Sequence, residues 1–309
     1  TRRDIITLLL LVLMSVFLFA DQKIMGAIIK ELSKEYSVSR ETLGFIGSAF
    51  TLIGAIISII FGFQTDRFSR KKLLVAVVLI GEIPCVLTGI PFFTQSIEAF
   101  TVLRILTGIG IGGIYPITFS LLADYFHEEH RATASAWVGV AWVIGQMAGQ
   151  SIAGFVTPSF GWRLTFILVA IPNFLLVLIF ALYAREPERG RTEKALESLI
   201  QKGLAYKQKI TLSDFKIIFA NKTNLWTFLQ GLPGTVPWGI LGFFMIDFLE
   251  LKRHFKKEEA TLIFMLIGAG LLIGSVLFAN IAERLYKKNP KSMPFLCGIG
   301  ILAGVIPAY

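Results

Sequence analysis

Few of the residues that build catalytic and metal sites occur in this chain. Its 309 residues include 2 Cys and 3 His. Cys85 and Cys297 lie in apolar runs without metal-ligand spacing, and the histidines lie in predicted loops. No serine–histidine arrangement and no phosphate-binding loop with a lysine is visible. We therefore expect a protein that is not an enzyme and that holds no metal or cofactor.

Charged residues are also scarce, at 17% against about 25% in globular chains. The hydrophobic set makes up 54% and the mean hydropathy is +0.69, which excludes a disordered chain and argues against a compact soluble domain. The net charge of +9 does not indicate a nucleic-acid partner, because the basic residues occupy short loops between apolar runs. The predicted partner is a lipid bilayer.

Apolar runs long enough to cross a bilayer, which needs about 20 residues, recur along the chain. They predict spanning helices at residues 5–29, 42–63, 73–94, 99–123, 132–156, 163–184, 224–249, 260–282 and 293–309. The last run stops without a polar flank, so we expect the protein to continue beyond it. The fold class is therefore an all-α membrane protein.

A polar stretch divides these helices into two groups. We predict an N-terminal six-helix lobe at 1–184, a cytoplasmic linker with an amphipathic helix at 185–223, and a partial C-terminal lobe of about three helices at 224–309. With the N-terminus inside, 20 of the 30 Lys and Arg residues face the cytoplasm and 8 face the other side. The positive-inside rule therefore favours a cytoplasmic N-terminus.

The two groups share a charged pattern. Asp66–Arg67 follows the second span, and Glu283–Arg284 follows the eighth at an offset of 217 residues. Both pairs are expected in a tight loop between two spans. Two parallel copies of one bundle explain the pattern, with chance similarity of charged loops as the alternative.

Several segments resemble the major facilitator superfamily. GFQTDRFSRKK (62–72) is similar to its cytoplasmic loop signature, and RILTGIGIGGIYP (104–116) to its Arg-Gly-rich fourth helix. LLADYFHEEHRATASAW and FGWRLTFIL follow in the family's order. The resemblance implies about twelve helices in two parallel six-helix lobes around a central cavity, with the second lobe incomplete in this chain.

Within the superfamily, FADQ, LSKEYSVSRETLGFIGSAF and GGIYPITFSLLADYF most resemble spinster-type transporters. That resemblance implies a lysolipid-like substrate. The chain has Gly112 and Gly113 where the spinster pattern usually has an acidic residue, and Gln22 where it has Arg. Members that transport small organic anions are therefore the alternative.

Ionisable residues inside spans are the main functional candidates, because such groups usually face a cavity or a partner. Asp21 lies about 12 Å inside span one and Arg104 about 8 Å inside span four, from the same side. The two side chains can therefore pair across a cavity wall. We predict that they couple proton binding to transport and contact the substrate; a permanent structural ion pair is the alternative.

Three further charges lie within spans. Glu82 falls near the midplane of span three and is a second candidate proton carrier, unless it is a silent carboxyl bonded to a helix. Lys23 lies about 200° around the helix from Asp21, so we expect it to point away from the cavity. Asp247 lies near the outer end of its span and is expected at the rim.

A cytoplasmic latch and a substrate-binding strip complete the candidates. The resemblance implies that the loop after span two latches the lobes together, with Asp66 near a helix N-terminus and basic residues facing Asp124. The latch residues are Gly62, Asp66, Arg67, Arg70, Asp124 and Arg131. The alternative is that the basic residues only set topology. Trp142, Gln146 and Gln150 form a polar strip on span five that is a candidate substrate contact.

The glycines of span four spell GxGxxG, at Gly108, Gly110 and Gly113. No strand precedes them, so they do not indicate a dinucleotide site, and close helix packing explains them. The sequence predicts a monomeric, multi-pass secondary active transporter of a bacterial inner membrane, driven by a proton gradient and working by alternating access. A receptor that uses the same fold without transport is the alternative from another class.

Overall fold

The computed structural model describes residues 2–189, 216, 219–289, 292, 295, 296 and 298–300. These residues are helical almost throughout, and none of them forms a strand. The helices are α1 (Arg2–Ala27), α2 (Ile29–Tyr36), α3 (Arg40–Thr65), α4 (Arg70–Thr88), η1 (Pro91–Phe93), α5 (Ile97–Tyr125), α6 (Glu128–Phe160), α7 (Trp162–Tyr183), α10 (Lys222–Arg253) and α11 (Lys257–Lys288).

The first eight predicted spans each coincide with one long helix of this set. Most of the ninth, 293–309, lies outside the described residues, as does most of the predicted linker, 185–223. Serine side chains fix three of the helix starts. Ser39, Ser69 and Ser96 each precede a helix and accept a hydrogen bond from the backbone N–H three residues later, which satisfies a donor that the helix itself cannot pair.

Five helices in the described part of the chain are long and apolar enough to cross a membrane: α1, α3, α5, α7 and α10. Helix α4 has only 19 residues and carries Arg70, Lys71 and Lys72 in its first turn and Glu82 further along. Its charges therefore set it apart from the five, although it packs among them.

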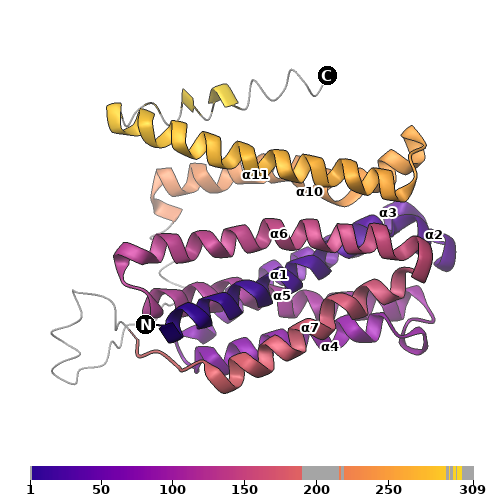
Figure 1. Ribbon diagram of the computed structural model, residues 1–309, viewed down its shortest axis with the longest axis horizontal. Coiled ribbons are helices and arrows are strands. Elements are labelled where there is room, and N and C mark those ends of the chain that lie inside the picture. The colour runs from indigo at the N-terminus through magenta and orange to yellow at the C-terminus, as the bar shows by residue number, and fades with distance from the viewer. Residues whose placement is uncertain are drawn as a thin grey trace. The chain divides into compact units, whose positions relative to one another are not determined.

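The chain divides into two compact units, Thr1–Leu262 and Ile263–Tyr309. In the first unit, α1 packs against α6 and α7, and α5 packs against both α3 and α4 (Figure 1). The second unit contains the later part of α11 and short helical stretches after it. The predicted division at 184 and 224 stays a prediction.

Glycines allow the helices of the first unit to approach closely. A Cβ added to Gly110 would lie 2.3 Å from the Cα of Gly81 on α4, and one on Gly112 would lie 2.2 Å from the carbonyl oxygen of Gly54 on α3. A Cβ on Gly149 of α6 would lie 2.0 Å from the carbonyl oxygen of Ala20. These glycines therefore serve helix packing, as expected for small residues in membrane helices.

The repeated charge pattern does not adopt one structure in both places. Asp66 and Arg67 lie in the short loop between α3 and α4, whereas residues 279–288 continue α11 as a helix. The expectation of two equivalent tight loops is therefore wrong. The second segment, ANIAERLYKK, contains no glycine and no capping serine, so nothing in it ends the helix.

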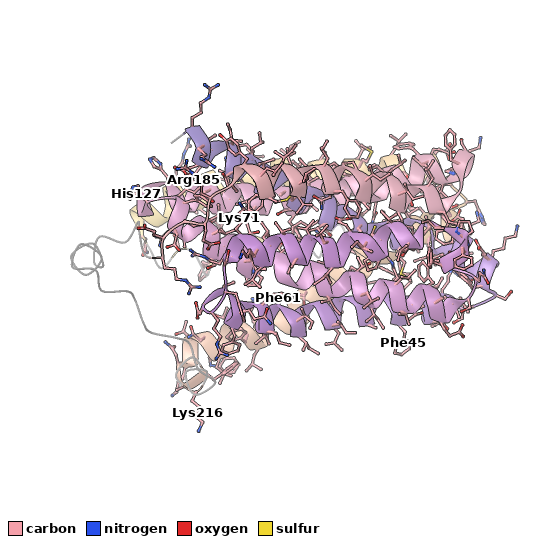
Figure 2. All side chains as sticks on the ribbon, turned by 90° about the horizontal axis from the view of Figure 1, so that it is seen from below. Phe45, Phe61, Lys71, His127, Arg185 and Lys216 are labelled. Atoms are coloured by element: carbon pink, nitrogen blue, oxygen red, sulfur yellow. The ribbon has the colours of Figure 1, made fainter. Side chains whose placement is uncertain are left out.

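We call the two ends of the first unit the Arg70 end and the Arg40 end. The Arg70 end carries the start of α4 and the ends of α3, α5 and α7, and the Arg40 end carries α2 and the start of α3. Figure 2 shows Lys71, His127 and Arg185 toward the Arg70 end and Phe45 nearer the opposite end.

Candidate functional site

Asp21 of α1 and Arg104 of α5 form a buried ion pair. Arg104 Nη1 donates to Asp21 Oδ1 at 2.8 Å, and 1% of Asp21 and 2% of Arg104 is exposed. The sequence placed both residues at similar depth from the same side, and the structure brings them together. The second carboxylate oxygen, Oδ2, is buried and forms no hydrogen bond within the described residues.

Polar and aromatic groups hold the Arg104 guanidinium in place. Its Nη2 donates to the hydroxyls of Thr88 at 2.9 Å and Thr107 at 3.2 Å. Its Cζ lies 4.5 Å from the centroid of the Phe166 ring, a distance at which the ring face attracts a cation. Residues of α4, α5 and α7 therefore hold the guanidinium in place. Asp21 of α1 supplies its only ion pair among the described residues.

The pair lies at the wall of a cavity of about 690 Å³ in the first unit. This volume is within the range of small-molecule sites, about 300–1,000 Å³. Helices α1, α3, α5 and α10 supply the wall, which is mostly apolar or glycine. The lining residues are Asp21, Gln22, Lys23, Met25, Gly44, Gly47, Ser48, Phe50, Thr51, Leu52, Ala55, Arg104, Thr235, Val236, Gly239, Ile240, Phe243 and Phe244.

Lys23 also lines this cavity, so the expectation that it points away is wrong. Two residues rotate a helix by about 200°, but the cavity lies between α1 and both α3 and α10 and therefore reaches more than one face of α1. The Lys23 side chain reaches α10, since a Cβ added to Gly242 of α10 would lie 3.0 Å from Lys23 Nζ.

Glu82 of α4 is fully buried but does not reach the cavity. Asn173 of α7 donates to Glu82 Oε1 at 2.6 Å and to the carbonyl oxygen of Met14 at 3.2 Å. Glu82 forms no ion pair within the described residues, and its Oε2 has no hydrogen bond there. Its role as a proton carrier stays a prediction. Its hydrogen bond with Asn173 connects α4 to α7.

The predicted strip on α6 does not line the cavity. Gln150 is buried and donates from Nε2 to the carbonyl oxygen of Gly242 on α10. Trp142 is 41% exposed and Gln146 is half-buried. Gln150 therefore bridges α6 and α10, and α10 occupies the position at which we expected Gln150 to face the substrate. The substrate contacts of Trp142 and Gln146 stay predictions.

Arg70 organises the Arg70 end. Its guanidinium pairs with Asp124 of α5, donates to Glu186 Oε1 at 3.0 Å and donates to the carbonyl oxygen of Pro187 at 2.7 Å. Only 3% of Arg70 is exposed. The expected contact between Arg70 and Asp124 is confirmed. These contacts join the start of α4 to α5 and to the segment after α7.

Glu186 is the anion at the α4 N-terminus. Its carboxylate accepts hydrogen bonds from Ser69 Oγ at 2.6 Å and from the backbone N–H groups of Arg70 at 3.2 Å and Lys71 at 2.8 Å. Burial raises the pKa of this carboxyl, but these hydrogen bonds and that from the Arg70 side chain outweigh burial and lower its pKa overall. Asp66, which the resemblance places near a helix N-terminus, follows the last residue of α3 and precedes Ser69, the N-cap of α4.

The other predicted latch residues have separate positions. Asp66 follows the last residue of α3 and lies 3.8 Å from Arg189 Nη1. Arg131 donates to the carbonyl oxygen of Ala123 at 2.9 Å, so it contacts the end of α5. Arg67 is exposed, and nothing lies within 4 Å of a Cβ added to Gly62. The contacts described here lie within residues 65–189, and a latch between lobes stays a prediction.

Ion pairs at the Arg40 end connect α10 and the start of α11 to the first helices. Arg40 Nε lies 2.8 Å from Asp247 Oδ2, and Lys30 Nζ lies 3.1 Å from Glu250 Oε1. Asp247 is thus at the predicted end but is buried and paired.

Lys257 adds a branched contact to this end. Its Nζ pairs with Glu31, lies 3.6 Å from Glu250 Oε2 and donates to the carbonyl oxygen of Ala27 at 2.9 Å. Sequence reasoning missed this network, which we call the Arg40-end ion pairs. The signal was present in KRHFKK (252–257), whose basic charges are unusual for a loop that the positive-inside rule predicts to face away from the cytoplasm.

The chain matches the family described as Major Facilitator Superfamily over residues 11–309. The chain belongs to this superfamily. The resemblance stated from the sequence is therefore confirmed, and so is an all-helical, multi-pass membrane fold with a second lobe that is incomplete in these 309 residues.

Two relatives within the superfamily have names that refer to small organic molecules. The chain is 27% identical over 275 residues to the cis,cis-muconate transport protein of Acinetobacter baylyi, covering 87% of this chain and 64% of the relative. It is 33% identical over 165 residues to a putative niacin/nicotinamide transporter of Bacillus subtilis, covering 53% of this chain and 39% of the relative. The chain thus spans less than two thirds of the length of either relative.

A solved superfamily structure has the same fold. It is a bacterial homolog of the human lysosomal transporter spinster, in an inward-facing and unoccupied conformation, with a TM-score of 0.74 and 23% identity. The match covers 94% of this chain and 64% of that one. At this identity the likeness concerns the fold alone.

Proposed function

We propose that the protein is a secondary active transporter that moves a small organic anion together with a proton. The observation that carries the proposal is the buried Asp21–Arg104 pair at the wall of a cavity of small-molecule size. Ionisable groups are expensive in a membrane interior and usually mark a substrate or proton pathway. A transporter needs such a pathway, whereas a receptor that only binds a ligand does not.

Protonation of Asp21 would supply the coupling. An arginine side chain stays charged in proteins, so neutralising Asp21 leaves Arg104 without its counter-ion. The buried Oδ2 of Asp21 is the atom that can take the proton. Protonation makes the cavity more positive by one charge, so an anionic substrate binds there more tightly, and proton binding and substrate binding favour each other.

Alternating access would use the Arg40-end ion pairs as one closure. They connect residues 27–40 to α10 and to the start of α11, and α10 also supplies part of the cavity wall. Opening this end requires these pairs to separate. Transporters of this kind rock one helical bundle against the other around a central site.

A small organic anion is better supported than the lysolipid that the sequence suggested. Support comes from the names of the muconate and niacin relatives, whereas the spinster likeness concerns the fold alone. The proposal places the protein in a membrane as a transporter rather than an enzyme.

Exchange in liposomes tests this proposal. The full-length protein, reconstituted with niacin or muconate inside, should take up the labelled anion from outside without any gradient. Lysophosphatidylcholine loaded in the same way should not drive such exchange. Uptake equal to that of protein-free liposomes for both anions would exclude the proposed function, and binding without exchange would favour the receptor alternative.

A further inference from the structure

The cavity contains one more cationic group than anionic groups. Asp21 and Arg104 neutralise each other through their 2.8 Å contact. Lys23 is the third charged residue of the wall, and its ammonium forms no ion pair or hydrogen bond with the described residues. The wall therefore carries one uncompensated positive charge.

We propose that Lys23 binds the carboxylate of the substrate, while Asp21 and Arg104 act on the proton. This inference rests on the proposed function and assigns its substrate contact. A lysine ammonium offers three hydrogen-bond donors, and a charge-assisted hydrogen bond in a water-poor site is stronger than a neutral one. An anion of single charge satisfies this ammonium without displacing Asp21 from Arg104.

The surfaces around Lys23 favour a flat apolar body attached to that carboxylate. Phe243 and Phe244 on α10 lie with ring centroids 4.8 Å apart and face small residues of α3. The Phe243 ring occupies the space beside Gly47, where an added Cβ would lie 2.6 Å from Phe243 Cε2. Phe50 adds a third ring to the wall. A planar aromatic monocarboxylate matches this combination of rings, glycines and one cation.

Gly242 lies beside the ammonium of Lys23. A Cβ added there would lie 3.0 Å from Lys23 Nζ, which is tighter than an ordinary van der Waals contact. Substitution by alanine would shift the ammonium by a few tenths of an ångström without changing its charge. Gly242→Ala is therefore a second way to disturb the proposed contact.

Binding of niacin and nicotinamide to the purified full-length protein tests the assignment, because the two ligands share a ring and differ in charge. We expect the wild type to prefer niacin. Lys23→Gln should weaken niacin binding by about tenfold or more and leave nicotinamide binding unchanged, and Lys23→Arg should retain part of the affinity. Lys34→Gln, at an exposed lysine of α2, is the matched control and should bind as the wild type does.

The possible results separate this inference from the proposed function. If Lys23→Gln and Gly242→Ala both bind niacin as tightly as the wild type, Lys23 is not the carboxylate ligand, and the proposed function stands. If Lys23→Gln does not fold, weaker niacin binding by Gly242→Ala supports the inference and unchanged binding overturns it. If the wild type neither binds nor exchanges niacin or muconate, the proposed function fails first.

Discussion

Arg104 and Asp21 lie 83 residues apart in the sequence, on two different helices, and approach within 2.8 Å. Both are almost fully buried, so each depends on the other as its counter-ion. Removing two charges from water is costly, and removing one member of a buried pair leaves the other uncompensated. The pair therefore affects stability and transport, and different substitutions separate the two effects.

Arg104→Ala should destabilise the protein strongly. It leaves the Asp21 carboxylate buried without a cation, which costs about 3–5 kcal/mol in comparable sites. Asp21→Asn keeps the shape and one hydrogen-bond acceptor, so its effect on stability should be smaller. Thermal unfolding in detergent measures both, and equal melting temperatures for Arg104→Ala and the wild type would contradict the assigned ion pair.

The Asp21–Arg104 contact was predictable because both charges are rare in spans and lie at similar depth. Lys23 was not, because a rotation angle along one helix does not tell how far a cavity extends around that helix. Glu186 was missed for a related reason, since it caps a helix that begins 116 residues earlier in the chain. The lengths of the apolar runs predicted the helices, but contacts between distant segments needed the packed structure.

Glu186 should make stability depend on pH. Its hydrogen bonds lower its pKa in the folded state, so its contribution is complete above the unfolded-state value, about 4.3. The contribution is lost as the pH falls through the lower folded-state value. Thermal unfolding measured from neutral to acidic pH should show a loss of stability in the wild type that is reduced in Glu186→Gln.

Glu188→Gln is the matched control, because Glu188 is exposed in the same segment. It should follow the wild-type pH profile. A Glu186→Gln profile that coincides with the wild type at every pH would show that the carboxylate does not stabilise the start of α4.

Gly110→Ala should destabilise the packing of α4 against α5. The added Cβ would lie 2.3 Å from Gly81 Cα and 2.8 Å from the carbonyl oxygen of Val77, so the two backbones must separate. Gly139→Ala has nothing within 4 Å and should be neutral or stabilise by up to about 1 kcal/mol through helix propensity. Equal thermal stability of the two variants would contradict the close approach.

Lys257→Gln should favour opening at the Arg40 end. It removes the cation between Glu31 and Glu250, so the two carboxylates lose their shared partner. In a cysteine-free background with Met25→Cys, at a buried position of the cavity wall, a membrane-impermeant maleimide should react several times faster after the Lys257→Gln substitution. Lys34→Gln is the control, and an unchanged rate for Lys257→Gln would contradict the proposed closure.

We propose that Asp21 couples the proton to the organic anion. The decisive measurement is uptake of labelled niacin into liposomes that are alkaline inside, corrected for protein-free liposomes. We predict accumulation by the wild type and by Glu188→Gln, whereas Asp21→Asn should exchange niacin but fail to accumulate it. Gradient-driven accumulation by Asp21→Asn at the wild-type level would show that Asp21 does not couple the proton to the anion.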